Sequence, residues 1–146
     1  MKFIIILLFS IVYPQVAIAN ELHDSYMKYR DGYYKNDLSD MLAMISKENL
    51  EDIDIKGVTT SPIKFDLQFP FISSITTSLV KELSYFETID ETLGCLTVNG
   101  LSADYAPITI SLKYILEGGY WKMGYVKIEY LSGYSDFAKE AVCPRA

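Results

Sequence analysis

The feature that most constrains this chain is an alternating stretch around two adjacent glycines near its carboxyl end. From Ile108 to Leu116, apolar side chains occupy every second position, which is the period of a strand with one buried face. Gly118-Gly119 suits a two-residue hairpin turn, because both positions of such a turn take a positive φ. A return strand is expected from Tyr120 to Leu131. The sequence therefore predicts a β-hairpin over residues 108–131.

The register of this hairpin follows from the length of its turn. On one face the predicted cross-strand pairs are all apolar: Leu116–Trp121, Tyr114–Met123 and Leu112–Tyr125. On the other face, Ile115 pairs with Lys122 and Lys113 with Gly124. Beyond Tyr125 the apolar positions shift by one residue, beginning with Val126. One extra residue in the return strand would produce this shift, and we predict a β-bulge or bend near Gly124.

The first part of the chain has helical periodicity instead. Glu21–Lys35 is predicted to be a helix whose apolar positions recur at steps of three and four: Leu22, Tyr26, Tyr29 and Tyr33. Asn36-Asp37 offers a cap, and a second, shorter helix is expected from Leu38 to about Lys47. Because the connection is short, the two helices are expected to form a helical hairpin.

The middle of the chain is less regular. Ile63 to Phe69 alternates between flanking prolines, which indicates an edge strand. Ile72–Leu83 has a helical stripe, and Thr92–Val98 is predicted to be a strand that ends in a turn at Asn99-Gly100. Helices followed by antiparallel strands predict the α+β class. We expect the amino-terminal helices to pack on one face of a bent antiparallel sheet, in a cone-like arrangement.

The amino terminus predicts export. Lys2 supplies a positive end, residues 3–12 are almost entirely apolar, and Ala17-Ile18-Ala19 places small residues where a signal peptidase selects them. A membrane anchor is the alternative, but the apolar run has about half the length that a bilayer requires. We expect residues 1–19 to be a signal peptide cleaved after Ala19. Residues 20–146 would then be a single domain in the periplasm or outside the cell.

The net charge and the cysteine content limit the kinds of partner and cofactor that are expected. The chain carries 13 Lys and Arg against 19 Asp and Glu, and loss of Lys2 would make it more acidic. An acidic protein is a poor partner for nucleic acid or for an anionic membrane surface. After export, the two cysteines, Cys95 and Cys143, are expected to form a disulfide. A redox or metal site is the alternative, but it lacks a C-x-x-C spacing, and we expect no metal and no cofactor.

Two blocks of the sequence resemble a known superfamily. In SYMKYRDGYYKNDLSDML a tyrosine-bearing helix runs directly into a second helix, and in ITISLKYILEGGYWKMGYVKIEYL a glycine turn is followed by Trp-Lys. Together they resemble the nuclear transport factor 2-like (cystatin-like) superfamily, cone-shaped α+β domains that include polyketide cyclases, ketosteroid isomerase and non-enzymatic secreted proteins. The resemblance implies a pocket between the helices and a curved sheet. A shared fold does not by itself determine function.

Tyrosine is the most unusual component of the chain, with 12 residues. A buried tyrosine needs a partner for its hydroxyl, so inward-facing tyrosines suit an aromatic core, a pocket with polar tips or a dimer face. Tyr130 is also predicted to face inward. The residues predicted to line a cavity and bind a ligand are Tyr26, Tyr29, Tyr33, Tyr114, Trp121 and Tyr125.

No catalytic motif accompanies these aromatic residues. By analogy with catalytic members of the superfamily, an acid inside the cone would be Asp31, Asp37 or Asp104. The sequence instead favours exposure to solvent for Asp31, a helix-capping role for Asp37 and a turn position for Asp104. The only histidine, His23, lies where chains often fray, which argues against a catalytic or metal-binding role.

The functional hypothesis is a non-catalytic exported domain that binds a small apolar ligand or a periplasmic protein partner. Such a domain could act as a monomer or as a homodimer. The first alternative is a cyclase- or isomerase-type enzyme that works by proton transfer in the cavity. The second is a periplasmic inhibitor or immunity protein.

Overall fold

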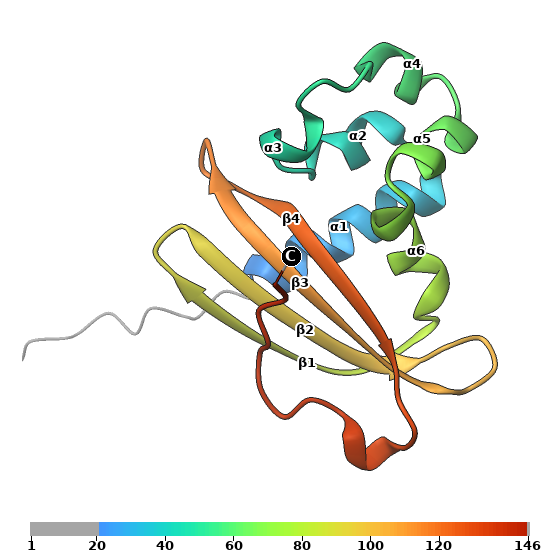
Figure 1. Cartoon of the computed structure of the whole chain (residues 1–146), viewed down its shortest axis with the longest axis vertical. Coiled ribbons are helices and arrows are strands. Elements are labelled where there is room, and N and C mark those ends of the chain that lie inside the picture. The colour runs from blue at the N-terminus through green and yellow to red at the C-terminus, as the bar shows by residue number, and fades with distance from the viewer. Residues whose placement is uncertain (1–20, 146) are drawn as a thin grey trace, which may run out of the picture.

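The computed structural model describes residues 21–145, and the predicted signal peptide lies outside this range (Figure 1). The helices are α1 (Glu21–Lys35), α2 (Leu38–Ala43), α3 (Lys47–Leu50), α4 (Ile55–Thr59), α5 (Pro62–Gln68) and α6 (Pro70–Ser78). The strands are β1 (Lys81–Asp90), β2 (Leu93–Leu101), β3 (Pro107–Glu117) and β4 (Tyr120–Tyr130), and a 3-10 helix, η1 (Tyr134–Asp136), follows. The strands form one antiparallel sheet in sequence order, so the predicted α+β class is confirmed. Within the described range, no helix has the length and apolar character needed to cross a bilayer.

The junction between the first two helices has the predicted form. Asn36 takes a left-handed φ of 53°, which ends α1. Asp37 then caps α2, because its Oδ1 accepts the N–H of Asp40 at 3.1 Å. The second helix ends earlier than predicted, at Ala43, since Met44 and Ser46 form backbone hydrogen bonds to Met123 of β4.

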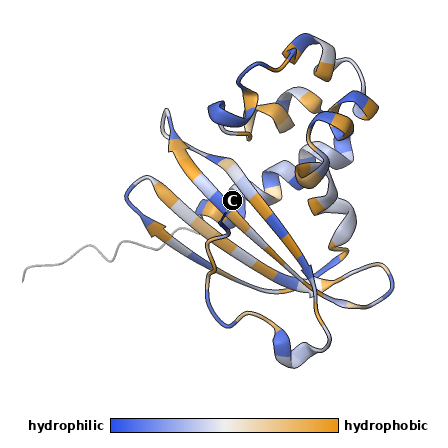
Figure 2. Cartoon of the chain, viewed as in Figure 1, coloured by the Kyte–Doolittle hydropathy of each residue, from blue (hydrophilic) through white to orange (hydrophobic). Residues whose placement is uncertain are grey.

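One face of the sheet packs against the helices. Figure 2 shows apolar and polar residues alternating along the strands, as expected for a sheet with two different faces. The buried side chains of this layer come mainly from α1, α6 and the two central strands: Leu22, Tyr26, Tyr29, Ile72, Ile75, Leu96, Val98, Ile108, Ile110, Leu112 and Tyr114. The predicted apolar faces of the first helix and of β3 are thus the core of the protein.

The opposite face is crossed by the segment after β4, here called the tail (residues 131–145), which lies in front of the sheet in Figure 1. Asn99 Nδ2 donates to the Ala138 carbonyl at 2.8 Å, and Thr97 Oγ1 accepts from the Val142 amide at 2.8 Å. The Cys95–Cys143 disulfide, which was predicted, links the same strand to the tail covalently. The tail is therefore held along β2.

The β3–β4 hairpin confirms the predicted turn and corrects its register. Gly118 and Gly119 have φ values of 58° and 82°, as a two-residue turn requires. The pairs before Gly124 are as predicted, but Gly124 is the extra residue of the bulge, so Lys113 pairs with Tyr125. The predicted pairs Lys113–Gly124 and Leu112–Tyr125 are therefore wrong, and Leu112 pairs with Val126.

The strand predicted for Ile63–Phe69 is wrong, because these residues lie in α5 and its cap. Pro62 occupies the start of that helix, where its missing N–H has no intrahelical partner to lose. Phe65 and Phe69, four residues apart, are buried, whereas Ile63 and Leu67 are exposed. The spacing of the apolar residues in this segment therefore fits a strand as well as a helix. Only the burial of Phe65 and Phe69 shows that the segment is helical.

Two further boundaries differ from the prediction. The helix expected for Ile72–Leu83 begins at Pro70 and ends at Ser78, and Leu83 belongs to β1. Asn99-Gly100 lies inside β2 and is not a turn. A side chain on Gly100 would come within 2.3 Å of the Lys81 carbonyl oxygen, so this glycine allows close packing against β1.

Candidate functional site

Three of the predicted cavity residues lie together in the core. Tyr26 and Tyr29 of α1 and Tyr114 of β3 are fully buried. Tyr29 donates its hydroxyl hydrogen to the Ile72 carbonyl at 3.1 Å, whereas the Tyr114 hydroxyl has no hydrogen-bond partner among residues 21–145. Burial raises the pKa of Tyr114 well above its usual value of 10. These tyrosines join α1 to the sheet and to α6.

The other predicted residues lie elsewhere. Tyr33 is half-buried at the border of the core, and Trp121 Nε1 donates to Glu21 Oε2 at 2.8 Å. Tyr125 and Tyr130 were predicted to face inward, but 37% and 64% of their surface is exposed. For Tyr125, the bulge residue Gly124 reverses the phase of the strand, and Tyr130 is the last residue of β4.

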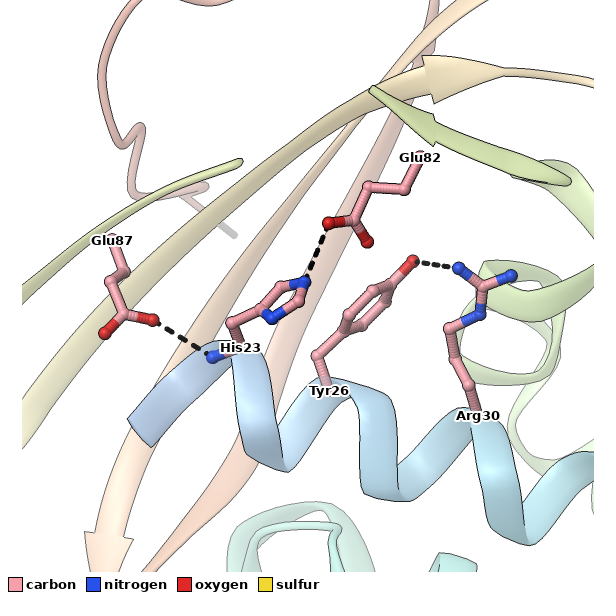
Figure 3. Close-up of polar contacts among 5 residues, drawn as sticks. All are labelled: His23, Tyr26, Arg30, Glu82 and Glu87. Carbon is pink, nitrogen blue, oxygen red and sulfur yellow. Dashed lines mark hydrogen bonds and ion pairs between the residues drawn. The ribbon is translucent and has the colours of Figure 1, made fainter. Parts of the chain in front are cut away.

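The structure brings together a polar group that the sequence did not predict, here called the His23 cluster and shown in Figure 3. Its members are His23, Tyr26 and Arg30 of α1 with Glu82 and Glu87 of β1. His23 Nε2 lies 2.8 Å from Glu82 Oε1, and its backbone N–H donates to Glu87 Oε2 at 3.0 Å. The imidazole also stacks on Tyr85 with 3.8 Å between ring centroids.

Arg30 completes this cluster on the next turn of α1. It is 8% exposed, and it donates to the Tyr26 hydroxyl at 3.3 Å and to the Leu79 carbonyl at 3.1 Å. Burial raises the pKa of Tyr26 to about 12, against the opposing effect of the nearby Arg30 guanidinium. The arginine therefore ties α1 to the segment that enters β1.

The His23 cluster has the residue types of an acid–base site, but its groups are engaged within the fold. The His23 side chain is 15% exposed, stacked on Tyr85 and bonded to Glu82. Sequence reasoning missed the cluster because its contacts join residues about 60 positions apart. The only signal was the position of His23 one residue after Leu22 and three before Tyr26, on the side of the helix that approaches the sheet.

A concave, mostly apolar site lies at the other side of the helical layer, here called the α6–β4 cleft. It has a volume of about 310 Å³. Its lining residues come from the end of α5, the start of α6 and the bulge of β4, with one side chain from α3: Asn49, Gln68, Phe69, Pro70, Phe71, Ile72, Gly124, Tyr125 and Val126. Of the residues predicted to bind a ligand, Tyr125 lines this cleft.

The local sequence explains why the cleft forms here. Pro70 begins α6 immediately after α5 ends, so the chain bends at Phe69. On the opposite wall, a side chain on Gly124 would come within 3.0 Å of Ile115 Cδ1, which favours glycine at the bulge. Asn49 Nδ2 donates to the Gly124 carbonyl at 2.8 Å and fixes the bulge in place. Both walls of the cleft are thus defined by backbone geometry.

Large apolar side chains of α5 and α6 remain in solvent, and one of them, Phe71, lines this cleft. Ile63, Leu67 and Phe71 are 72%, 78% and 73% exposed, and they recur every four residues across α5 and α6. Single exposed apolar residues are common, but Phe71 also lines a concave apolar site, and this combination indicates a surface for binding.

The predicted acids occupy the positions that the sequence favoured over catalysis. Asp31 is exposed on α1, Asp37 caps α2, and Asp104 is exposed in the connection between β2 and β3. None of the three belongs to the His23 cluster or to the α6–β4 cleft.

Comparisons with protein-family models, with curated proteins and with solved structures give no significant match for this chain. The resemblance to the nuclear transport factor 2-like superfamily therefore stays a prediction. Function has to be argued from the geometry of the two sites.

Proposed function

We propose that the protein is an exported, non-catalytic binding domain that holds a small apolar ligand in the α6–β4 cleft. The observation that carries the proposal is the combination of a concave apolar lining with exposed apolar side chains beside it. Burying apolar surface favours association by about 25 cal/mol per Å² removed from water. Of the large apolar side chains in the lining, Phe71 and Tyr125 are the exposed ones, at 73% and 37%.

The lining also suggests the chemical class of the ligand. The volume of about 310 Å³ lies at the lower end of the range for small-molecule sites. Its polar side chains are the amides of Asn49 and Gln68 and the phenol of Tyr125, and the lining includes no Asp, Glu, Lys, Arg or His. We expect a small aromatic or aliphatic molecule with at most one or two uncharged polar groups.

The same lining argues against the enzymatic alternative at this site. Proton transfer requires an acid and a base within reach of one substrate. The cleft residues include no Asp, Glu, Lys or His, so Tyr125 is the only titratable side chain among them. The titratable groups of the His23 cluster bind one another at the β1 side of the sheet.

The test is a fluorescence titration with N-phenyl-1-naphthylamine, a neutral apolar dye that emits strongly when it leaves water. We expect saturable binding to the purified protein and about tenfold weaker binding to Phe71→Ser, since the phenyl ring contributes burial worth about 1.5–3 kcal/mol. Ile63→Ser is the matched control, because Ile63 is equally exposed but does not line the cleft. Equal loss in both variants, or no saturable binding to the unmodified protein, would overturn the proposal.

A further inference from the structure

The outer edge of β4 has a regular stretch of open backbone from Val126 to Tyr130. The N–H of Leu131 donates to the Pro107 carbonyl, so residues 127, 129 and 131 direct their backbone groups toward β3. Val126, Ile128 and Tyr130 therefore direct theirs away from the sheet. These three N–H and three C=O groups have no hydrogen-bond partner among residues 21–145.

The beginning of the same edge is already occupied by the chain itself. The N–H of Met123 donates to the Met44 carbonyl at 2.7 Å, and the Met123 carbonyl accepts from Ser46 at 2.9 Å. Asn49 then covers the Gly124 carbonyl. This contact ends at the bulge, and the open stretch starts directly after it. The edge thus forms an isolated parallel β-bridge with Ile45 at one end and has unpaired backbone groups at the other.

We propose that this open stretch pairs with a second copy of itself, so that two sheets join antiparallel across a twofold axis at Ile128. Ile128 would then exchange both backbone hydrogen bonds with Ile128 of the second copy, and Val126 would do so with Tyr130 of the second copy. An interface of this kind is isologous, because each copy contributes the same surface.

The charges on the strand select this register. With the axis at Ile128, Lys127 lies opposite Glu129 of the second copy, and Glu129 lies opposite Lys127. Both pairs occupy positions that are not hydrogen-bonded, where side chains approach most closely. A shift of the axis to Lys127 would place lysine opposite lysine, and a shift to Glu129 would place glutamate opposite glutamate. Opposite charges therefore face each other in this register and like charges in the two neighbouring ones.

The apolar side chains of the strand fit the same arrangement. Val126 and Ile128 pair with Leu112 and Ile110 of β3, on the face that the helices cover. In the dimer, Tyr130 of the second copy would lie next to Val126, at the border of the α6–β4 cleft. This contact would remove part of the exposed surface of Tyr130 from water. The inference does not depend on the proposed ligand, because the backbone and charge pattern alone define it.

The first experiment measures the oligomeric state by sedimentation velocity over a wide range of protein concentration. We expect a monomer–dimer equilibrium in the unmodified protein. Lys127→Glu places two glutamates opposite each other at both pairs, and about tenfold weaker dimerisation is expected; Glu129→Lys should act equally. Lys127 Nζ lies 2.9 Å from Glu129 Oε1 of the same chain, but an ion pair this exposed contributes little to stability, so these variants should fold. The double variant Lys127→Glu with Glu129→Lys restores opposite charges and should restore dimerisation.

The second experiment locates the axis. In the proposed register, Ile128→Cys brings two Cα atoms to about 5.5 Å, which is within the range of a disulfide. Tyr130→Cys is the matched control, since its two copies would be offset by four residues, or about 13 Å along the strands. We expect an oxidised covalent dimer for Ile128→Cys only. A protein that stays monomeric at every concentration would overturn the inference, and so would a dimer that neither the charge variants nor the cysteine affects.

Discussion

At the β1 edge of the sheet, charged side chains lie against partners within the fold, whereas at the β4 edge apolar side chains and backbone groups remain open. Glu82 and Glu87 of β1 bind His23 of α1. Tyr125 and Phe71, beside β4, are in contact with solvent. The two edges belong to the same sheet, so the difference comes from what the sequence places beside each strand.

Both edge strands carry one irregularity. The register of β1 shifts between Glu82 and Ser84, after which residues 84–90 pair regularly with β2, and exposed charged residues such as Lys81 and Asp90 lie at its ends. Bulges and charges are the usual means by which an edge strand avoids joining another sheet. In β4 the bulge lies at Gly124, and the five residues after Tyr125 are regular. The two edges therefore differ in their side chains, because Glu82 and Glu87 of β1 are bound by His23, whereas Lys127 and Glu129 of β4 are exposed.

The largest effect is expected from removing the disulfide, which supports β2 beside the β1 edge. In the chain-entropy model, a disulfide between residues 48 positions apart stabilises the fold by about 4 kcal/mol. We expect Cys95→Ala with Cys143→Ala to lower the free energy of unfolding by about that amount in urea titrations. Dye binding to the α6–β4 cleft should persist, because the tail lies on the opposite face.

Hydrogen exchange sharpens this prediction. The tail is anchored to Cys95, Thr97 and Asn99 of β2, and Asn99 Nδ2 also donates to Ser84 of β1. Loss of the disulfide should therefore speed amide exchange more in β1 than in the outer half of β4. Equal acceleration in both strands would contradict the view that the edges are supported separately.

A smaller loss of stability is expected from Arg30→Ala, which affects the His23 cluster beside β1. The substitution leaves the Leu79 carbonyl and the Tyr26 hydroxyl without the buried guanidinium that donates to both. We expect the free energy of unfolding to fall by about 3 kcal/mol. Lys28→Ala, on the exposed side of the same helix, is the control and should change it by less than about 0.5 kcal/mol. Similar losses in the two variants would show that the His23 cluster contributes little to stability.

The sequence predicted the parts of this fold that depend on local patterns. The apolar residues from Leu22 to Tyr33, spaced three and four apart, predicted the bounds of α1. The two-glycine turn and the alternating apolar residues beside it predicted the β3–β4 hairpin with a bulge near Gly124. Both patterns span many residues with one periodicity, and such patterns are reliable. The Cys95–Cys143 disulfide was also predicted, because the sequence has only two cysteines and was expected to be exported.

The candidate sites were not predictable to the same extent, for a physical reason. The His23 cluster and the α6–β4 cleft bring together residues that are distant in the chain, such as Phe71 and Tyr125, which line the same cleft. The short apolar run at Ile63–Phe69 also fits a strand and a helix equally, and the cleft depends on which one forms. The number of tyrosines does not show which of them are buried, so it could not distinguish the buried Tyr114 from the exposed Tyr125.

The smallest effects are expected from a matched pair of tyrosine substitutions in the core between the two edges. Tyr114→Phe removes a buried hydroxyl that has no partner among the described residues, so the free energy of unfolding should rise by about 1 kcal/mol. Tyr29→Phe removes a hydroxyl that donates to the Ile72 carbonyl, and stability should fall by about 1 kcal/mol. Ile72 lines the α6–β4 cleft, so Tyr29→Phe should also weaken dye binding, whereas Tyr114→Phe should leave it unchanged. If both substitutions changed stability in the same direction, the hydrogen bond from Tyr29 to Ile72 would not be what holds α6 against α1.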